Sequence, residues 1–391
     1  MSVDELAREL IRGLDAVVPR DTPRPIALHE PEFGEDEQHL VGECIRSGWV
    51  SSVGSYVDEF EDCLRQLTGS KFAVAMASGT AALQLALHVL GVRPGDEVLV
   101  PTLSFVATAN AVSHCGAIPH FIDSEASTLG LDPAALRERL HAVGLRNETN
   151  LLNRETGRRI SAVIPMHAFG LACKIEEIAL VADEFGLPVI EDAAESLGTH
   201  LATHHCGRVG RAAMLSFNGN KIVTTGNGGA IITDDEAIAA SCKHLSTTAK
   251  LKHPWRFDHD QIGWNYRLPN LNAALGVAQL KRLDDIARRK RQLHDNYVTE
   301  LKDNPNMTVI SERPGTRSNY WLNTIRIPSI TFQERESLLT RLHQEGYMCR
   351  PVWTLLHKLP MYTGSPRGEL SQAAMLENEL INLPSGPRLR K

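Results

Sequence analysis

The chain has 391 residues, 42% of them hydrophobic and 23% charged, which is the composition of a folded globular protein with room for one large and one smaller domain. Its formal net charge of -6 argues against general binding to nucleic acid, which requires a basic surface. The acidic N-terminus does not resemble a signal peptide, no apolar run reaches the length of a membrane span, and the seven cysteines contain no CxxC pair, so we expect a cytoplasmic protein without membrane contact or a disulfide framework.

Residues 35–235 alternate short β-rich runs with helical segments, which is typical of a parallel sheet covered by helices. Between the first two runs, residues 80–90 are rich in Ala and Leu and predict a buried helix that ends before Gly91. The predicted strands are residues 72–75, 97–100, 118–122, 162–165, 188–191, 213–216 and 229–233.

The last third of the chain has a different pattern. After Pro269, apolar residues recur at helical spacing as far as Leu301, which predicts one long helix. The remaining residues predict a small α/β domain, with β-like runs at 307–310 and 320–325 and a helix at 333–345.

These patterns divide the chain into a large domain, residues 36–270, and a small C-terminal domain, residues 271–391. The long helix, about residues 270–301, links the two, and residues 1–35 are expected to pack beside the small domain. The chain has one run of basic residues, Arg288 to Arg291, within this helix. We interpret the run as a solvated helix face.

Two charged side chains in the first two thirds of the chain suggest chemistry. Lys221 lies in a loop rich in Gly, Asn and Thr between two predicted strands, and Asp192 ends the fifth predicted strand. A buried carboxylate is costly unless it is paired, and the pyridinium nitrogen of pyridoxal phosphate (PLP) is a suitable partner. A lysine amine can bind PLP as a Schiff base and later move a proton, although a lysine on a loop is by default a solvated residue.

PLP also needs a site for its phosphate. Ser78, Gly79 and Thr80 stand directly before the predicted helix, where backbone N–H groups, hydroxyls and the helix dipole favour an anion. Ser216 offers another hydroxyl. The SGTAAL segment could equally be a simple N-capped helix, and the glycines of GNGGA could form a tight turn.

Several motifs in this order resemble the DegT/DnrJ/EryC1/StrS sugar aminotransferases, and the resemblance covers nearly the whole chain. They are GWVSSVGSYVDEFE, ASGTAALQLAL, VPTLSFVATANA, PMHAFG, EDAAESLG, SFNGNK and GWNYRLPNLNAALG. The resemblance implies PLP-dependent transferase fold type I, as in aspartate aminotransferase, with a mostly parallel seven-stranded sheet in the large domain. It also implies a cofactor that alternates between PLP and its pyridoxamine form (PMP).

The resemblance implies residue roles too. Lys221 carries PLP, Asp192 pairs with the pyridine nitrogen, and Phe105 stacks on the ring. The phosphate is held by residues of the predicted helix start and of the sixth strand, joined by Asn265 from a second subunit, so a homodimer with shared active sites is implied. Glu195 lies near the phenolic oxygen of the cofactor, where an ionised carboxylate would repel it, so it is either protonated or hydrogen-bonded elsewhere.

Glu195, SFVATANA and RPVWTLLHKLPMY are most similar to the branch that aminates C4 of UDP-2-acetamido-4-keto-2,6-dideoxyhexose with L-glutamate as donor. That branch supplies the bacillosamine and legionaminic acid pathways of bacterial surface glycans, including lipopolysaccharide and other surface polysaccharides. Alternatives within the family are amination at C3 and a dTDP- or GDP-linked sugar. By the same resemblance, the candidate sugar or nucleotide contacts are Ser51, Ser52, His167, Arg267, Trp353 and His357.

Other interpretations remain open. His167 could equally be a buried core histidine. His200, His204, His205 and Cys206 could bind zinc, but Gly198 and Gly207 bracket them, so we expect an exposed hairpin with solvated imidazoles and no metal. A PLP-bound regulator without turnover is a second class of function, and an NAD-dependent oxidoreductase is a third. The oxidoreductase would need GxGxxG at the first strand–helix turn, which reads ASGTAA instead.

Overall fold

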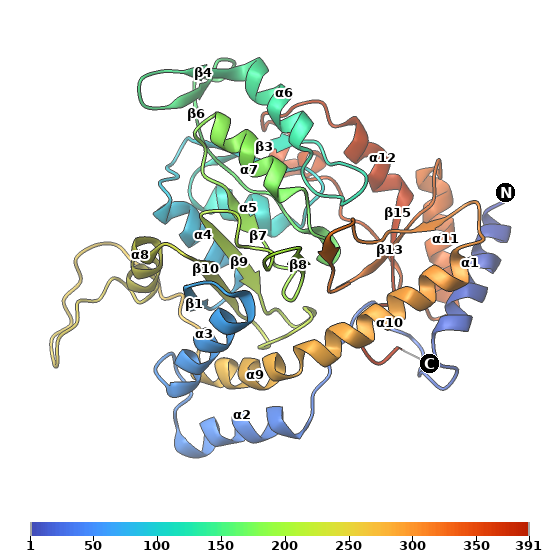
Figure 1. Ribbon diagram of the computed structural model, residues 1–391, viewed down its shortest axis with the longest axis horizontal. Coiled ribbons are helices and arrows are strands. Elements are labelled where there is room, and N and C mark those ends of the chain that lie inside the picture. Colours follow the sequence, from blue (N-terminus) through green and yellow to red (C-terminus); the bar gives the residue numbers. More distant parts are fainter. Residues whose placement is uncertain (1, 390–391) are drawn as a thin grey trace.

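The computed structural model describes residues 2–389, and its centre is a large twisted sheet (Figure 1). Strands lie in the order β1-β10-β9-β7 in one part and β3-β2-β6-β5-β4 in the other. Parallel bridges from Val163 to Val189 and from Met166 to Asp192 join the two parts. The strands are β1 (Phe72–Met76), β2 (Glu97–Pro101), β3 (Ile118–Ile122), β4 (Gly144–Arg146), β5 (Leu151–Asn153), β6 (Arg159–Val163), β7 (Ile190–Asp192), β9 (Ala212–Ser216) and β10 (Gly229–Thr233).

All seven predicted strands are present, and most of the sheet is parallel as predicted. β2 pairs in parallel with β3 and β6, and β7 pairs in parallel with β9. Among the predicted strands the exception is β10, which runs antiparallel to both β1 and β9. Outside them, β5 pairs antiparallel with β4 and β6. The fourth strand begins earlier than predicted, at Arg159, and the β4–β5 hairpin was not predicted.

Helices cover both faces of the sheet because both faces of its strands are apolar. Val98 and Val100 of β2 pack in a cluster with α4 and α5, whereas Leu99 between them packs with α6 and α7. This alternation follows from the pleat of a strand. The helices around the sheet are α3 (Ser55–Thr68), α4 (Gly79–Val89), α5 (Val106–His114), α6 (Pro133–Val143), α7 (Ile175–Glu184) and α8 (Glu236–Ser246), whereas α2 (Glu35–Ser47) packs on α9 (Asn270–Lys281).

The predicted long helix is two helices, α9 (Asn270–Lys281) and α10 (Leu283–Leu301). They meet at Arg282, whose φ of -100° and ψ of -3° interrupt the helical hydrogen bonding. Arg282 turns its guanidinium to Glu37 of α2 and Glu32, so ion pairs fix the junction. Figure 1 shows the pair running from beneath the sheet to the C-terminal part of the chain.

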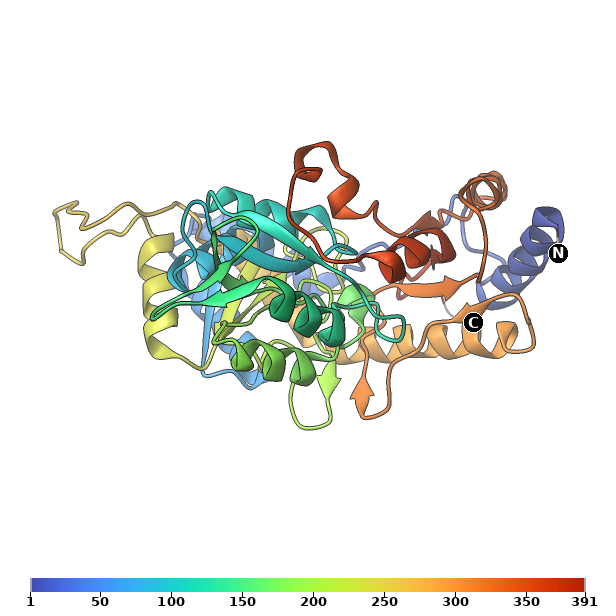
Figure 2. The same ribbon diagram turned by 90° about the horizontal axis from the view of Figure 1, so that it is seen from above.

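The C-terminal part is a small antiparallel sheet with two helices. Its strand order is β11-β13-β15-β14, and the N-terminal helix α1 (Val3–Val17) packs on α10 and α11 in this part, at the opposite end of the molecule from α8 (Figure 2). The division of the chain at residue 270 stays a prediction. The elements here are β11 (Thr308–Val309), β13 (Asn323–Arg326), α11 (Phe332–Gln344), β14 (Arg350–Pro351), α12 (Ser371–Glu379) and β15 (Leu380–Leu383).

Two predictions about charged and polar runs were wrong. In the basic run, Arg289 and Lys290 are buried, because α10 packs between the two parts of the molecule. The histidine segment forms the predicted hairpin, with an antiparallel bridge from His200 to His205, but the imidazole of His205 is buried and not solvated. Its strand β8 (His200–Leu201) also pairs with β12 (Thr316–Arg317). Burial lowers the pKa of His205 to about 3, so its neutral ring accepts a hydrogen bond from the backbone N–H of Gly198 at 2.7 Å.

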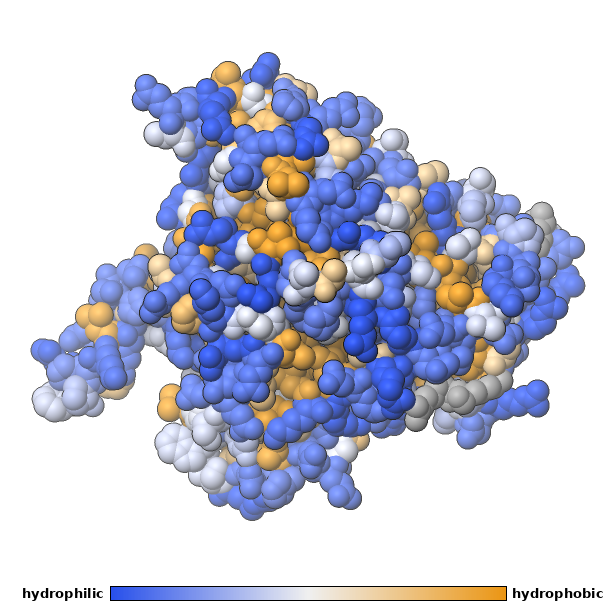
Figure 3. Space-filling view, in the orientation of Figure 1, coloured by the Kyte–Doolittle hydropathy of each residue, from blue (hydrophilic) through white to orange (hydrophobic). Residues whose placement is uncertain are grey.

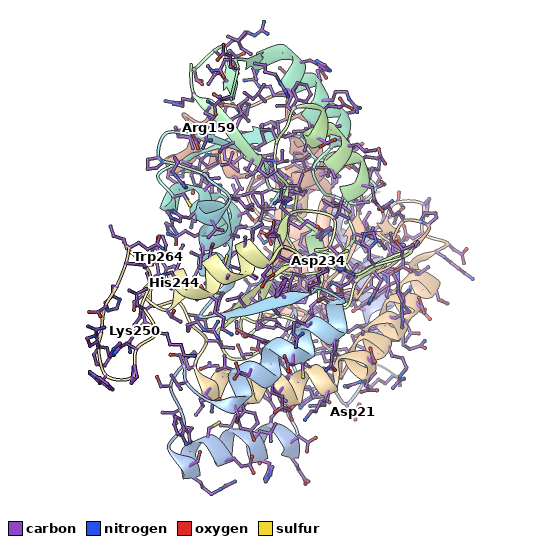
Figure 4. The ribbon with its side chains drawn as sticks, turned by 60° about the vertical axis from the view of Figure 1, so that its left-hand side comes forward. Asp21, Arg159, Asp234, His244, Lys250 and Trp264 are labelled. Carbon is purple, nitrogen blue, oxygen red and sulfur yellow. The ribbon has the colours of Figure 1, made fainter. Side chains whose placement is uncertain are left out.

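Between α8 and α9 the chain leaves the body of the molecule as an arm, residues 249–263 (Figures 1 and 2). Figure 4 shows Lys250 out on this arm and His244 and Trp264 at its base. Within residues 2–389, no helix combines the length and apolar character needed to cross a bilayer.

Candidate active site

Four strands end at the same edge of the sheet, and side chains singled out in the sequence gather there. β1 leads into Ser78, β2 into Thr102, β7 ends at Asp192, and β9 ends at Ser216 before the loop that carries Lys221. Carboxyl ends of parallel strands are where open α/β sheets bind ligands.

Asp192 is almost fully buried, with 2% of its surface exposed. One carboxylate oxygen accepts a hydrogen bond from the Thr108 hydroxyl at 2.7 Å, and the other accepts one from the backbone N–H of Ala194 at 3.1 Å. Burial raises the pKa of Asp192, because these two donors do not replace the water it loses. Among the ion pairs of the described residues none includes Asp192, so this carboxylate fits a cationic ring nitrogen.

Lys221 is held between a carboxylate and an aromatic ring. Its Nζ donates a hydrogen bond to Oε1 of Glu195 at 3.1 Å and lies 4.1 Å from the ring centroid of Trp321. The other oxygen of Glu195 accepts from the backbone N–H of Phe169 at 2.8 Å. Burial raises the pKa of Glu195 to about 6, although Lys221 acts in the opposite direction. Glu195 is thus hydrogen-bonded within the protein, one of the two states expected from the sequence.

The start of α4 forms a tight cradle next to β9. Ser78 caps the helix, with its Oγ accepting from the backbone N–H of Ala81 at 3.2 Å. A Cβ on Gly79 would lie 3.1 Å from the Cβ of Ser216, and one on Gly229 would lie 2.5 Å from the Gly79 nitrogen. Only glycine allows the backbones to approach this closely. A Cβ on Gly79 would also lie 3.3 Å from Oγ of Ser216, so this hydroxyl lies beside the first turn of α4, a position that fits a phosphate.

Three aromatic side chains lie near the same edge. Phe105 precedes α5 and leaves 48% of its surface exposed, so a ring face is available to a ligand. Trp353 lies 6.4 Å from Phe105 and stacks on Phe169 at 4.6 Å between ring centroids. Phe169 has a φ of 56°, an uncommon value for a residue with a side chain. These contacts bring Trp353, from the C-terminal part, to the edge of the large sheet.

The structure argues against a substrate contact by His167. Its imidazole is fully buried, its Nε2 hydrogen-bonds with Glu191 at 2.9 Å, and its Nδ1 accepts from the backbone N–H of Cys173 at 3.2 Å. Glu191 also accepts backbone N–H groups of Gly207, Val209 and Gly210 at 2.7–2.8 Å. Both nitrogens of His167 are used in the core, so the core interpretation is the one that fits.

Of the other candidate substrate residues, two are held against the large sheet and two lie on a loop. Arg267 is buried and pairs with Glu61 at 2.9 Å, leaving its Nη1 without a hydrogen-bond partner within residues 2–389. His357 shares a hydrogen bond of 2.7 Å with Thr102 at the end of β2. These contacts hold both side chains against the large sheet. Their substrate roles stay predictions, as do those of Ser51 and Ser52, which lie on the loop between α2 and α3.

Asn265 lies on the surface at the base of the arm, in a bridge to Thr247. The arm carries exposed apolar side chains, with Trp255 78% and Ile262 87% exposed, and in Figure 3 it projects from the body with pale and orange groups among blue ones. Its placement leaves Asn265 accessible from outside the chain.

Sequence reasoning missed two side chains of this site. Thr108 lies one helical turn after Phe105 on α5, and this spacing could have revealed it. Trp321 lies 101 residues from Asn220, whose backbone oxygen it contacts, and its surrounding sequence has no feature that points to Lys221.

The chain is similar to known aminotransferases in both sequence and fold. Residues 31–391 match the model of the DegT/DnrJ/EryC1/StrS aminotransferase family. The chain is 36% identical over 365 residues to "GDP-perosamine synthase" of Vibrio cholerae, covering 93% of this chain and 95% of the relative. It is 37% identical over 339 residues to "Putative pyridoxal phosphate-dependent aminotransferase EpsN" of Bacillus subtilis, covering 87% and 84% of the two chains. The crystal structure of the aminotransferase TlmJ from Streptoalloteichus hindustanus is 28% identical and superimposes with a TM-score of 0.82, covering 92% of this chain and 93% of TlmJ.

Proposed function

Because this chain belongs to the DegT/DnrJ/EryC1/StrS aminotransferase family, with fold type I and PLP as cofactor, we propose that it transfers an amino group from L-glutamate to C4 of a nucleotide-linked keto sugar. The protein is a nucleotide-sugar aminotransferase of polysaccharide biosynthesis. One observation carries the amino-transfer chemistry of this proposal: the Lys221 amine, the Asp192 carboxylate and the helix start at Ser78 lie at one edge of the sheet.

PLP supplies an electron sink at its protonated pyridine ring. In the proposed site Asp192 holds the proton on the ring nitrogen, and its buried position makes that charge pair strong. Ser78, Gly79, Thr80 and Ser216 bind the phosphate through backbone N–H groups and hydroxyls. Phe105 covers one face of the ring with its exposed surface and excludes water from it.

Lys221 has two tasks in this proposal. Its Nζ would hold the cofactor covalently, and once free, the same amine would move the proton between the substrate carbon and the cofactor. Glu195, 3.1 Å from Nζ, would pair with Lys221 in the ammonium form that it takes while it carries this proton. Glutamate leaves as 2-oxoglutarate after the first half-reaction, and the keto sugar takes the amino group in the second.

Two nucleotides are candidates for the sugar substrate. The 36% identity to a GDP-perosamine synthase extends over 93% of this chain, which favours a GDP-linked sugar. The resemblance to UDP-2-acetamido-4-keto-2,6-dideoxyhexose aminotransferases comes from the shorter SFVATANA and RPVWTLLHKLPMY segments, so UDP is the second candidate. Assays with GDP- and UDP-linked 4-keto sugars, with the product identified by NMR, distinguish them, and a 3-amino product would contradict the C4 assignment.

We also propose a homodimer in which Asn265 reaches the phosphate of the partner's cofactor. Asn265 is exposed beside an arm whose Trp255, Phe257 and Ile262 are largely exposed. Burying such side chains in a subunit contact removes them from water. The dimer would place each arm beside the other subunit's site.

The cofactor role of Lys221 is tested by absorbance. We expect the purified protein to show the visible band of lysine-bound PLP, which glutamate removes while releasing 2-oxoglutarate. Lys221→Ala and Lys221→Arg should both lack turnover, and the arginine variant controls for positive charge beside Glu195. A protein that takes up no PLP, or a Lys221→Ala variant with wild-type turnover, would refute the assignment.

A further inference from the structure

Trp321 has no part in the chemistry described so far, yet it touches the reactive lysine. Its indole ring lies under Lys221, with Nζ 4.1 Å from the ring centroid. Its Nε1–H donates to the backbone oxygen of Asn220, the residue before Lys221, at 2.8 Å. One side chain from the C-terminal part thus contacts both the lysine amine and the backbone that carries it.

The backbone of Trp321 is held as firmly as its ring. Its N–H donates to Oδ1 of Asn319 at 2.8 Å, and its oxygen accepts from Nζ of Lys290 at 3.0 Å. Asn319 also donates to the backbone oxygens of Glu195 and Leu197, at 2.9 Å each. Asn319 therefore fixes the indole relative to Glu195, the other contact of the Lys221 amine.

Lys290 is an unusual anchor for the Trp321 backbone, because it is fully buried, and burying a charged lysine without a carboxylate partner costs folding free energy. Its ammonium group donates to two backbone oxygens, those of Trp321 and Ser385, and none of the ion pairs of residues 2–389 includes it. Burial lowers the pKa of Lys290 to about 7. Tyr320, next to Trp321, adopts a φ of 46°, so the backbone at this point is strained as well.

We propose that Trp321 is a positioning residue that keeps the free amine of Lys221 between the Glu195 carboxylate and the indole face while the substrate occupies the cofactor. The inference rests on the proposed role of Lys221. A lysine side chain has four rotatable carbon bonds and would otherwise sample many positions once released. The indole face attracts Nζ when it is protonated, as it is while it carries the transferred proton, and Glu195 sets its direction. The amine then stays within reach of the carbon whose proton it moves.

The test compares Trp321→Phe, which keeps an aromatic face but loses the bond to Asn220, with Trp321→Met, which keeps apolar bulk but loses the face. Tyr297→Phe is the control, since it removes one buried hydrogen bond, to the oxygen of Pro384, away from Lys221. Single-turnover rates with glutamate, steady-state kcat and KM, cofactor content and the cofactor absorbance spectrum are measured for each variant.

For Trp321→Met we expect full cofactor content, KM values within about twofold of wild type, and a kcat lower by on the order of 10²-fold, as for a misplaced catalytic group. Trp321→Phe should recover kcat to within about tenfold of wild type. Tyr297→Phe should match the wild type. A wild-type kcat in Trp321→Met, or a change in KM alone, would overturn the proposal.

Lys290→Met provides a second route if Trp321→Met does not fold. It leaves the indole intact and removes one anchor of its backbone, although the buried oxygens of Trp321 and Ser385 then lose this donor, which lowers stability. We expect a lower kcat with unchanged KM, and a wild-type kcat in both Lys290→Met and Trp321→Phe would contradict the proposal. Failure of the proposed function is a separate result, because it would appear in the wild-type protein as missing PLP absorbance or in Lys221→Ala as retained turnover.

Discussion

Replacing Glu195 with glutamine tests the electrostatics of the site through a property of the whole chain, its stability. Glu195 is buried against Lys221 and Phe169, and burial raises its pKa to about 6 from 4.5. The folded protein therefore binds this proton more tightly than the unfolded chain does. The stabilising effect of the proton is fully present below pH 4.5 and is lost as the pH rises through 6.

The size of the effect follows from the shift. A difference of about 1.5 pKa units corresponds to about 2 kcal/mol over the full titration. Between pH 5 and pH 8 the linkage relation gives a change of about 1 kcal/mol in the free energy of unfolding. Glutamine at position 195 does not titrate. When the pH is raised from 5 to 8, the free energy of unfolding of Glu195→Gln should therefore rise by about 1 kcal/mol relative to that of wild type.

Urea unfolding of cofactor-free wild type and Glu195→Gln at pH 5 and pH 8 measures this double difference, in which titrating groups that do not interact with Glu195 cancel. Glu300→Gln on the surface of α10 is the matched control, for which we expect no pH-dependent difference. A difference between Glu195→Gln and wild type that does not change with pH would refute the reasoning. So would a change of opposite sign, which would mean that Lys221 outweighs burial at this carboxylate.

Other predictions follow from the same geometry. Asp192→Asn should lower kcat by at least about 10²-fold while the cofactor-free protein melts no lower than wild type, because burial disfavours this carboxylate. A lower melting temperature of Asp192→Asn would show that burial does not disfavour the Asp192 carboxylate. Mixing inactive Lys221→Ala and Asn265→Ala proteins should produce active hybrid dimers, and no regained turnover after verified subunit exchange would exclude shared sites. Glu191→Ala leaves three backbone N–H groups and His167 without their acceptor, so thermal melting should show a loss of at least about 3 kcal/mol, and an unchanged melting temperature would rule this out.

Elements with strong local signals were predicted well. The predicted strand at residues 229–233 is β10, and the Ala- and Leu-rich helix predicted at 80–90 is α4, Gly79–Val89. The residue types within each segment determine its secondary structure, since β-branched runs favour strands and alanine favours helix. The antiparallel direction of β10 was not predictable in this way, because pairing depends on segments distant in the chain.

Errors arose where a distant partner overrides a local pattern. The pattern from Pro269 to Leu301 reads as one helix, but Arg282 breaks it to reach Glu32 and Glu37. The basic run reads as solvated, but packing of α10 buries Lys290 against backbone oxygens. Periodicity reports the spacing of apolar residues and carries no information about such long-range partners.

The amino-acid order alone determined the parts of the candidate site that depend on neighbours in the chain: a serine and a glycine before a helix, a carboxylate at a strand end, and a lysine in a loop of small residues. Tertiary structure decided the surroundings of the lysine. Trp321 contacts Asn220, 101 residues away, and Asn319 contacts Glu195, 124 residues away, while Lys290 holds the backbone of Trp321. Only the packing of the C-terminal part against the sheet brings these side chains to Lys221. Contacts of that kind leave no periodic trace in a sequence, because each depends on the position of a whole element and not on the spacing of residues within it.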